Sequence, residues 1–174
     1  MKMEVVQLTV ESIEAARANW TTAAIESDMP ETDVEMRMDW AAKHISYVDQ
    51  AAAFAYGIVD DQKRIVGLMD IYYSKRPGKD QGWLKMMQLY LSPEYSYEVV
   101  KDNADKILTV ADIYTAAITG TIELTGAHKA RVVKIFGRDE LLFTILVALK
   151  TQLAAIATFN VTIEGRWLVL SPKE

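Results

Sequence analysis

The spacing of the apolar residues changes several times along this chain, and the order of those changes constrains the fold more than any other feature. Apolar and polar residues alternate in segment 4–10, and the segments 53–59, 64–74, 83–91, 129–136 and 159–170 also have the residue types of strands. Helical spacing marks the segments that start near residue 11, near 32, near 102 and at 139. The chain therefore predicts a strand, two helices, three strands, a helix, a strand, a helix and a closing hairpin.

Local signals set the ends of these elements. Thr9 or Ser12 is available as the N-cap of the first helix, and Thr32 followed by Glu35 has the spacing of a capping box for the second. Asp102 or Asn103 can cap the third helix, which keeps its period as far as Gly126. Gly120 and β-branched neighbours lower helix propensity, so a strand that begins early stays an alternative there. The closing hairpin, 159–170, turns at residues 164–165.

Length and composition limit the class of protein. The 174 residues suit one domain spanning 1–174, without repeat or low-complexity segment. A formal net charge of −5 without a basic, aromatic run predicts no nucleic-acid partner. The absence of cysteine excludes disulfides and thiolate sites, and we expect a soluble, cytoplasmic protein without signal peptide or membrane span. His44 and His128 are isolated, so no metal site is expected.

A family resemblance follows from the order of elements together with one local motif. Residues 89–95, Leu-Tyr-Leu-Ser-Pro-Glu-Tyr, look like the end of the fourth strand of the N-acetyltransferases of the GNAT superfamily, and the whole chain resembles that family in element order. The resemblance implies an α/β (α+β) fold, with a curved, mostly antiparallel sheet of six to seven strands and about four flanking helices.

The same resemblance implies acetyl-CoA as a cofactor. In the family the backbone at the end of the fourth strand binds the pantetheine arm, which here assigns Leu89, Tyr90 and Leu91, and the following turn, with Ser96, meets the pyrophosphate. The family's turn carries a Gln or Arg, two residues, Gly, one residue, and Gly or Ala. This chain has no glycine anywhere in 83–119, and acidic residues follow the strand. Close approach of the backbone to a phosphate becomes difficult.

Acetyl transfer to an amine needs a base for the ammonium proton and an acid for the leaving thiolate. Asp70, inside the third expected strand of the chain's first half, is the candidate base, and Tyr95 is the candidate acid. For both, a structural role is the competing interpretation. Asp70 suits a solvated face or an ion pair with Lys85, and tyrosines at a sheet edge commonly pack their rings.

Two functional hypotheses therefore stay open. The first is a divergent acetyl-CoA-dependent N-acetyltransferase, an acyl-CoA N-acyltransferase acting on a small-molecule or protein amine. The second is a non-catalytic interaction or structural protein on the same scaffold, with a protein partner, similar to GNAT-like accessory and virion proteins of bacteriophages. In that case the protein would be virion-associated. The apolar hairpin 159–170 also suggests a homodimer.

Overall fold

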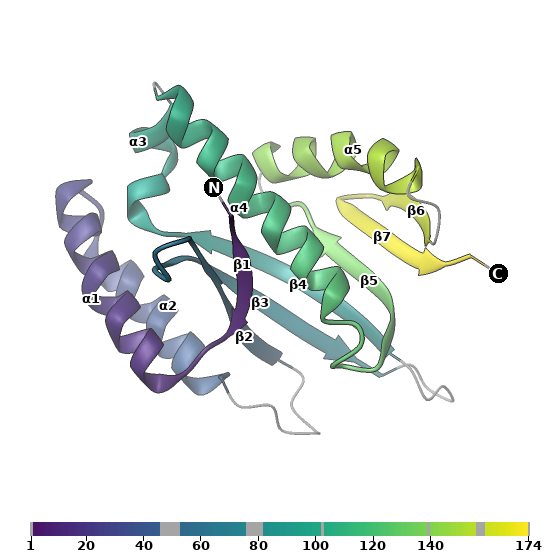
Figure 1. Cartoon of the computed structure of the whole chain (residues 1–174), viewed down its shortest axis with the longest axis horizontal. Coiled ribbons are helices and arrows are strands. Elements are labelled where there is room, and N and C mark those ends of the chain that lie inside the picture. Colours follow the sequence, from purple (N-terminus) through teal and green to yellow (C-terminus); the bar gives the residue numbers. More distant parts are fainter. Residues whose placement is uncertain are drawn as a thin grey trace. The chain divides into compact units, whose positions relative to one another are not determined.

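The computed structural model describes residues 2–45, 53–75, 82–101, 103–138, 140–155 and 159–173, with the side chains of residues 97 and 98 left aside. The strands are β1 (Glu4–Gln7), β2 (Ala53–Val59), β3 (Ile65–Ser74), β4 (Gly82–Leu91), β5 (Ala130–Phe136), β6 (Phe159–Glu164) and β7 (Trp167–Pro172). The helices are α1 (Val10–Glu26), α2 (Glu31–Lys43), the 3₁₀ turn η1 (Pro93–Tyr95), α3 (Tyr97–Val100), α4 (Ala104–Glu123) and α5 (Glu140–Ala155) (Figure 1).

The predicted fold class is confirmed. Seven strands form a mixed, mostly antiparallel sheet in the order β1-β2-β3-β4-β5-β7-β6, accompanied by the four longer helices α1, α2, α4 and α5. Strands β4 and β5 are neighbouring parallel strands joined by a helical crossover, and their paired residues run from Gly82 with Ala130 to Met86 with Ile135. The chain divides into two compact units, and both β3 and β4 run from one unit into the other. The assignment of a single domain stays a prediction.

Unit 1 consists of Met1–Asp70 and Leu89–Ala117. Helices α1 and α2 pack on a buried cluster that includes Trp20, whose indole Nε1 donates a hydrogen bond to the Ile65 carbonyl at 2.7 Å. Tyr90 packs against this cluster, whereas a Cβ built at Gly67 would meet Leu89 and Ile113 of α4. Neighbouring residues of a strand point to opposite faces of a sheet. Helices α1 and α2 therefore lie on one face of the unit 1 strands and α4 on the other.

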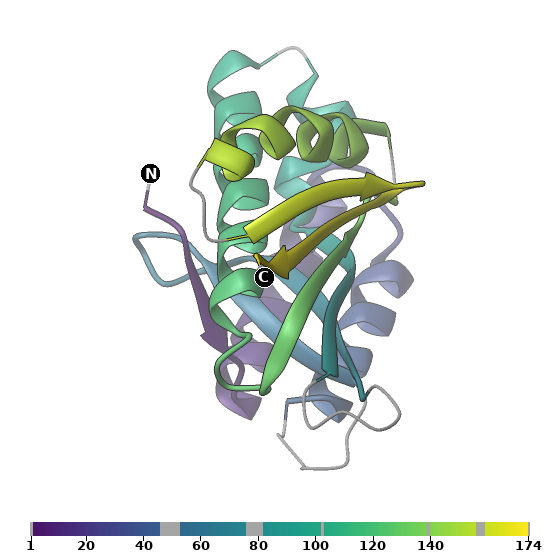
Figure 2. The ribbon, with the colours of Figure 1, turned by 90° about the vertical axis from the view of Figure 1, so that its right-hand side faces the viewer.

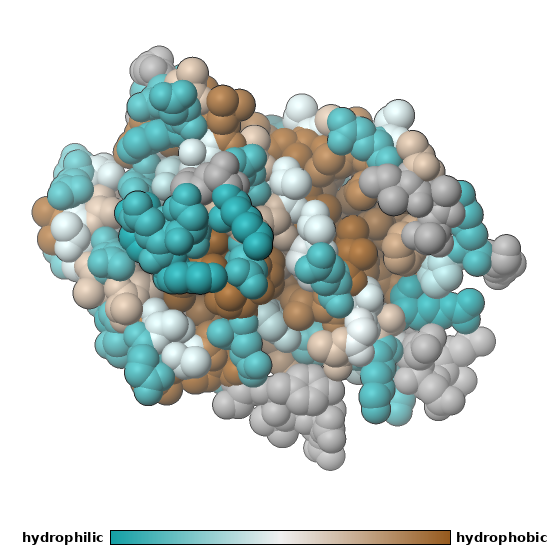
Figure 3. All heavy atoms as spheres, viewed as in Figure 1, coloured by the Kyte–Doolittle hydropathy of each residue, from teal (hydrophilic) through white to brown (hydrophobic). Residues whose placement is uncertain are grey.

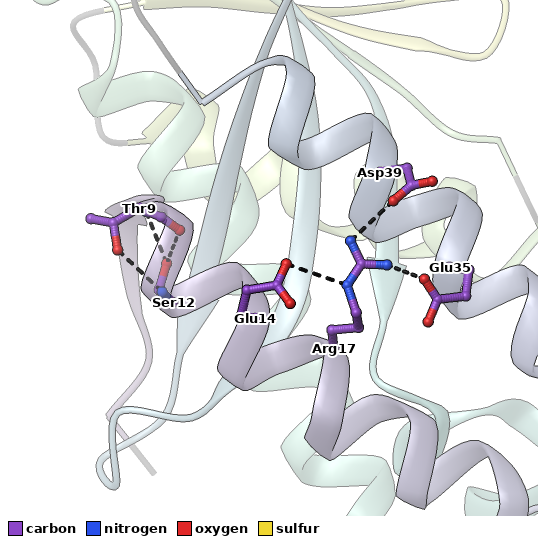
Figure 4. Close-up of polar contacts among 6 residues, drawn as sticks. All are labelled: Thr9, Ser12, Glu14, Arg17, Glu35 and Asp39. Carbon is purple, nitrogen blue, oxygen red and sulfur yellow. Dashed lines mark hydrogen bonds and ion pairs between the residues drawn. The ribbon is translucent and has the colours of Figure 1, made fainter.

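The start of α1 and its contact with α2 are held by polar side chains. Thr9 and Ser12 cap α1 reciprocally, each side chain accepting from the other's backbone N–H. The Arg17 guanidinium points at three carboxylates: Glu14 on its own helix at 3.5 Å, Asp39 on α2 at 3.0 Å, and Glu35 on α2 (Figure 4). These contacts join the two helices on their solvent side.

Three boundary expectations need correction or a decision. The Thr32–Glu35 capping box is wrong, because Pro30, with φ −62°, places the helix start at Glu31, so Thr32 lies inside the helix. Strand β1 ends at Gln7 rather than at residue 10, since Thr9 already caps the helix. The alternative of an early strand is decided in favour of helix: α4 continues through the buried Gly120 to Glu123.

Unit 2 consists of Ile71–Gln88 and Ile118–Glu174. Strand β7 pairs antiparallel with β5 on one side and with β6 on the other, and β6 is the edge strand of the sheet. Leu84, Ile135 and Leu168 lie on one face and are fully buried. Thr121 at the end of α4 contacts Met86 on that same face. Figure 2 shows α5 along one side of the β6–β7 hairpin, and Leu142 and Leu146 are its buried residues.

The surface of the two units differs in kind. On the face seen in Figure 3, hydrophilic side chains gather over the β2–β3 turn, whereas apolar side chains reach the surface along α5. The exposed apolar residues of α5 include Leu141 and Val147. Even so, none of the helices in the described ranges is long and apolar enough to cross a membrane.

Candidate functional site

The end of β4 from Leu89 and the segment that follows the strand belong to unit 1 and hold five of the six residues that the sequence singles out. The chain leaves the strand at Ser92, whose backbone N–H donates to the Val66 carbonyl on β3 at 3.0 Å. Ser92 and Pro93 are buried. This hydrogen bond and this burial fix the direction in which the loop departs.

The loop after β4 is folded into short helical turns rather than an open, glycine-rich arc. Its backbone N–H groups donate to carbonyls of the same loop. The bonds are Tyr95 N to Ser92 O (2.8 Å), Ser96 N to Pro93 O (3.0 Å), Val99 N and Val100 N to Ser96 O (3.0 Å each), and Asn103 N to Val100 O (2.9 Å). Amides engaged in this way have no second hydrogen to offer a ligand.

The first turn of α4 is also occupied by groups of the chain itself. The Asn103 side chain is the N-cap, accepting from the Lys106 backbone N–H at 3.1 Å, and the Asn103 carbonyl accepts from Ile107 N at 3.0 Å. The Lys106 ammonium reaches back to the Glu94 carbonyl at 3.2 Å. Asp105 adds negative charge to this turn. An N-terminus capped in this way has fewer free donors for an anion.

These observations test whether the loop fits the pyrophosphate of acetyl-CoA, and it does not. The family cradles the pyrophosphate with successive loop amides at a helix N-terminus. Here the amides of Tyr95, Ser96, Val99 and Val100 are consumed by the loop's own turns. The absence of glycine, seen in the sequence, is thus accompanied by a different backbone conformation.

The structure gives the strand-end residues definite surroundings. Tyr90 is half-buried, and the Arg37 guanidinium of α2 lies over its ring, 4.8 Å from the centroid. Leu89 approaches Gly67 on the α4 side. The paired register of β4 with β5 ends at Met86, so Leu89, Tyr90 and Leu91 extend past it along the described part of the strand. Their assignment to pantetheine stays a prediction.

Tyr95, the candidate acid, is 7% exposed. Burial is the main cause that raises the pKa of its phenol above the ordinary value of 10.0. The negative charge of Glu94 adds to the rise, and the Arg64 guanidinium opposes it. A buried phenol with a raised pKa keeps its proton, and its surroundings suit a packing role. Its assignment as an acid stays a prediction.

Asp70, the candidate base, lies in β3 and is 8% exposed.

The hydroxyl oxygen of Ser96 is buried and has no hydrogen-bond partner within the described ranges. A buried polar atom without a partner costs about 1–3 kcal/mol. The roles of Asp70 and Ser96 in chemistry or cofactor binding stay predictions. The described residues contain no group of three or more His, Cys, Asp or Glu side chains arranged to hold a metal ion.

Sequence reasoning missed the polar pair beside Tyr95. Asp60, 2% exposed, accepts hydrogen bonds at 2.9 Å from the backbone N–H groups of Gln62 and Arg64 and from Arg64 Nε. Arg64 Nη2 lies 2.8 Å from the same carboxylate. The pair closes the β2–β3 turn, so its role is structural. The signal available in the sequence was an aspartate that opens a turn, with an arginine four residues later.

Comparisons with known proteins agree with this fold. No protein-family model matches the sequence, and no curated protein matches it. Among solved structures, an aminoglycoside acetyltransferase from an uncultured soil metagenomic sample matches with a TM-score of 0.52, at 15% identity, over 94% of this chain and all of that chain. The ribosomal-protein-S5-alanine acetyltransferase of Vibrio fischeri matches with a TM-score of 0.51, at 13% identity, over 99% of this chain and 93% of that chain.

A third structure, a GNAT family acetyltransferase from Brucella melitensis in complex with acetyl-CoA, matches with a TM-score of 0.47, at 13% identity, over 99% of this chain and 90% of that chain. The first two matches show that this chain has the fold of GNAT acetyltransferases. Identities this low speak to the fold alone, and activity has to be argued from the residues themselves.

Proposed function

We propose that this protein is a non-catalytic binding protein built on the GNAT fold, which does not hold acetyl-CoA in the manner of the family. The observation that carries the proposal is the engagement of the loop amides of Tyr95, Ser96, Val99 and Val100 in hydrogen bonds within the loop. Binding a pyrophosphate there requires those bonds to break and the turns to unwind. The scaffold would then serve contacts with a partner.

The charge around the loop supports the same proposal. Glu94 and Asp105 flank the described backbone where a pyrophosphate would bring negative charges, and Lys106 donates to the Glu94 carbonyl. Like charges repel one another, so a phosphate is disfavoured next to these carboxylates. Opening the loop for a phosphate would therefore meet an unfavourable potential as well as lost hydrogen bonds.

Thermal melting of the full chain with and without acetyl-CoA tests this proposal. Ligand at ten times its dissociation constant stabilises a fold by about 1.4 kcal/mol. We expect no change in melting temperature at millimolar acetyl-CoA, and no release of free CoA with small amines or lysine peptides. A saturable rise in melting temperature that Asn103→Gly alters would contradict the proposal, because it would place the cofactor at this loop.

One observation favours an N-acetyltransferase as the second candidate. Strand β4 continues past Met86, its last residue paired with β5, as the resemblance implies for a pantetheine site. Under this hypothesis Asp70 and Tyr95 are the residues to replace. CoA release that falls in both Asp70→Asn and Tyr95→Phe, with melting temperatures unchanged, would support it over the binding protein.

Self-association through β6 also stays a proposal. The strand lies at the sheet edge, where unpaired backbone groups offer pairing sites. Its outward residues Asn160, Thr162 and Glu164 are exposed. Sedimentation at several protein concentrations tests it.

A further inference from the structure

Unit 2 differs in charge from the chain as a whole. It holds 11 of the 19 Lys and Arg residues and 6 of the 24 Asp and Glu residues, which gives a net charge of +5. Unit 1 holds the other 8 Lys and Arg residues and the other 18 Asp and Glu residues, which gives a net charge of −10. The whole-chain value of −5 is the sum of two opposite halves. The attraction of a polyanion depends on the local charge of the surface that it contacts.

The positive charge of unit 2 is concentrated on three adjacent strands and the segments that flank them. Segments 71–75, 82–88 and 124–138 carry no Asp or Glu. Strands β3, β4 and β5 lie next to one another in the sheet, so the cations of these segments share one region of unit 2. The cations are Lys75, Lys85, Lys129, Arg131, Lys134 and Arg138.

Two of these cations stand directly opposite each other. Lys85 on β4 and Lys134 on β5 are register partners across the parallel pair. Like charges directly opposite each other destabilise a sheet. Glu164 lies 3.7 Å from Lys134 and is 59% exposed, so it compensates one of the two charges only in part. An anion bound between the two ammonium groups would relieve the repulsion.

Trp83 lies close to both lysines. Lys134 Nζ is 4.6 Å and Lys85 Nζ is 5.4 Å from the centroid of its indole ring. On the same face of the sheet, Phe136 and Trp167 are register partners with ring centroids 4.9 Å apart. All five side chains are half-buried. We call this set, Trp83, Lys85, Lys134, Phe136 and Trp167, the lysine–tryptophan face.

The lysine–tryptophan face is the side of β4 and β5 opposite the fully buried Leu84, Met86 and Ile135. Leu84, Met86 and Ile135 alternate with its members along β4 and β5 and are fully buried, and Thr121 at the end of α4 contacts Met86 on their side. The members of the lysine–tryptophan face, by contrast, are half-buried rather than fully buried. Its rings and ammonium groups therefore remain partly open to solvent.

We propose that the lysine–tryptophan face of unit 2 binds single-stranded nucleic acid. Surfaces of this class combine cations that track the phosphates with aromatic rings on which bases stack. An acidic peptide would pair with the lysines and leave the rings unused, so the chemistry favours a ligand with both phosphates and bases. Duplex DNA hides its bases in the stack, which favours a single strand.

This inference changes the expectation drawn from whole-chain charge, which predicted no nucleic-acid partner. It also goes beyond the proposed function, because it concerns unit 2 and not the loop after β4. Acetyl-CoA melting tests the loop, and oligonucleotide binding tests the lysine–tryptophan face. Either proposal can fail without the other.

Fluorescence anisotropy of the full chain with a labelled single-stranded oligothymidylate tests the proposal; a length of about 20 nucleotides exceeds common site sizes. We expect saturable binding with a dissociation constant of about 10⁻⁴ to 10⁻⁶ M that weakens as salt rises from about 50 to about 200 mM. The double variant Lys85→Gln/Lys134→Gln should bind more weakly, with a salt slope smaller by about 1.4.

Lys150→Gln is the matched control, because Lys150 is an exposed cation of the same unit that lies on α5. It should bind as the unchanged protein does. Tryptophan emission should fall on binding, and Trp83→Phe, which keeps an aromatic ring at the site, should lose most of that change. Melting curves of all variants establish that they are folded.

Four results would overturn the proposal. They are no binding at low salt, equal loss of affinity in Lys150→Gln and in the double variant, equal affinity for a duplex of the same length, and competition by polyglutamate as effective as that by unlabelled oligothymidylate. The last result would identify an acidic protein surface as the ligand of this face.

Discussion

Unit 1 and unit 2 have similar architecture and opposite electrostatics. Both combine strands with packed helices, but unit 1 carries a net charge of −10 with helices on both faces of its strands, and unit 2 carries +5 with half-buried lysines and aromatic rings on one face of its strands. The comparison teaches that a net charge averaged over the whole chain gives no guide to a local surface. Partner predictions therefore need the charge of each unit separately.

The largest expected effect separates the stability of the two units. Trp20 is 1% exposed and donates a hydrogen bond to the Ile65 carbonyl, so Trp20→Ala should cost about 3–5 kcal/mol of unfolding free energy through the cavity that it leaves. Urea unfolding measures the loss, and hydrogen exchange locates it. We expect amides of unit 1 to lose protection before those of unit 2, with Trp20→Phe as the milder control. Equal loss in both units would show one cooperative fold.

A smaller effect is expected in unit 2 at Gly137. A Cβ at this position would lie 2.9 Å from the Phe143 backbone of α5, and Gly137 exchanges hydrogen bonds with Arg166 through its own N–H and carbonyl. Gly137→Ala should therefore cost about 1–3 kcal/mol in thermal or urea unfolding. Gly126→Ala is the matched control in the same unit, because a Cβ there meets only the Glu123 carbonyl at 4.0 Å. Equal effects of the two substitutions would contradict this packing account.

The two units should also differ in their response to pH. Burial lowers the pKa of His128 below its ordinary value of 6.5. The contribution of the neutral His128 to the free energy of unfolding is therefore fully present above pH 6.5 and is lost as pH falls through the lowered pKa. Burial raises the pKa of Tyr95 above 10.0. The contribution of the protonated Tyr95 to the free energy of unfolding is therefore present below pH 10.0 and is lost as pH rises through the raised pKa. His128→Gln should flatten the acid side and Tyr95→Phe the alkaline side of a melting-temperature profile. An unchanged profile in either variant would contradict that assignment.

The smallest expected effect is a gain. Ser96→Ala removes a buried hydroxyl without a partner in the described structure and should raise the unfolding free energy by about 1 kcal/mol or less. Differential scanning calorimetry measures the shift, and Ser92→Ala, at a buried serine of the same loop, is the comparison. A loss of stability in Ser96→Ala would show that the hydroxyl makes a bond in solution and would reopen its predicted role in ligand binding.

The fold could be predicted from the sequence because it rests on local periodicity. Strand β2 occupies 53–59 as expected, and β3, β4 and β5 begin within one residue of their predicted starts. Alternation marks one buried face in segment 4–10, whereas the apolar, β-branched and aromatic residues of β2 and β3 are typical of strands buried on both faces. The parallel pairing of β4 and β5 followed from the helical segment between them, because parallel neighbours need a crossover.

The candidate site could be predicted only in part. The missing glycines of the loop after β4 were visible, but the turns η1 and α3 that engage its amides depend on hydrogen bonds that no residue pattern specified. The capping box at Thr32 failed because Pro30 fixed the helix start two residues earlier than the motif requires. The lysine–tryptophan face escaped notice because Trp83 and Lys134 are far apart in sequence and meet only through strand pairing.

The discontinuity of unit 1 has a consequence for how the protein is made. Its second stretch, Leu89–Ala117, follows the first stretch of unit 2 in the chain. During synthesis the ribosome must therefore deliver part of unit 2 before unit 1 has all its residues, and no single proteolytic cut can release either unit as one continuous fragment. Excised halves should be poor substitutes for the full-length chain in any binding assay.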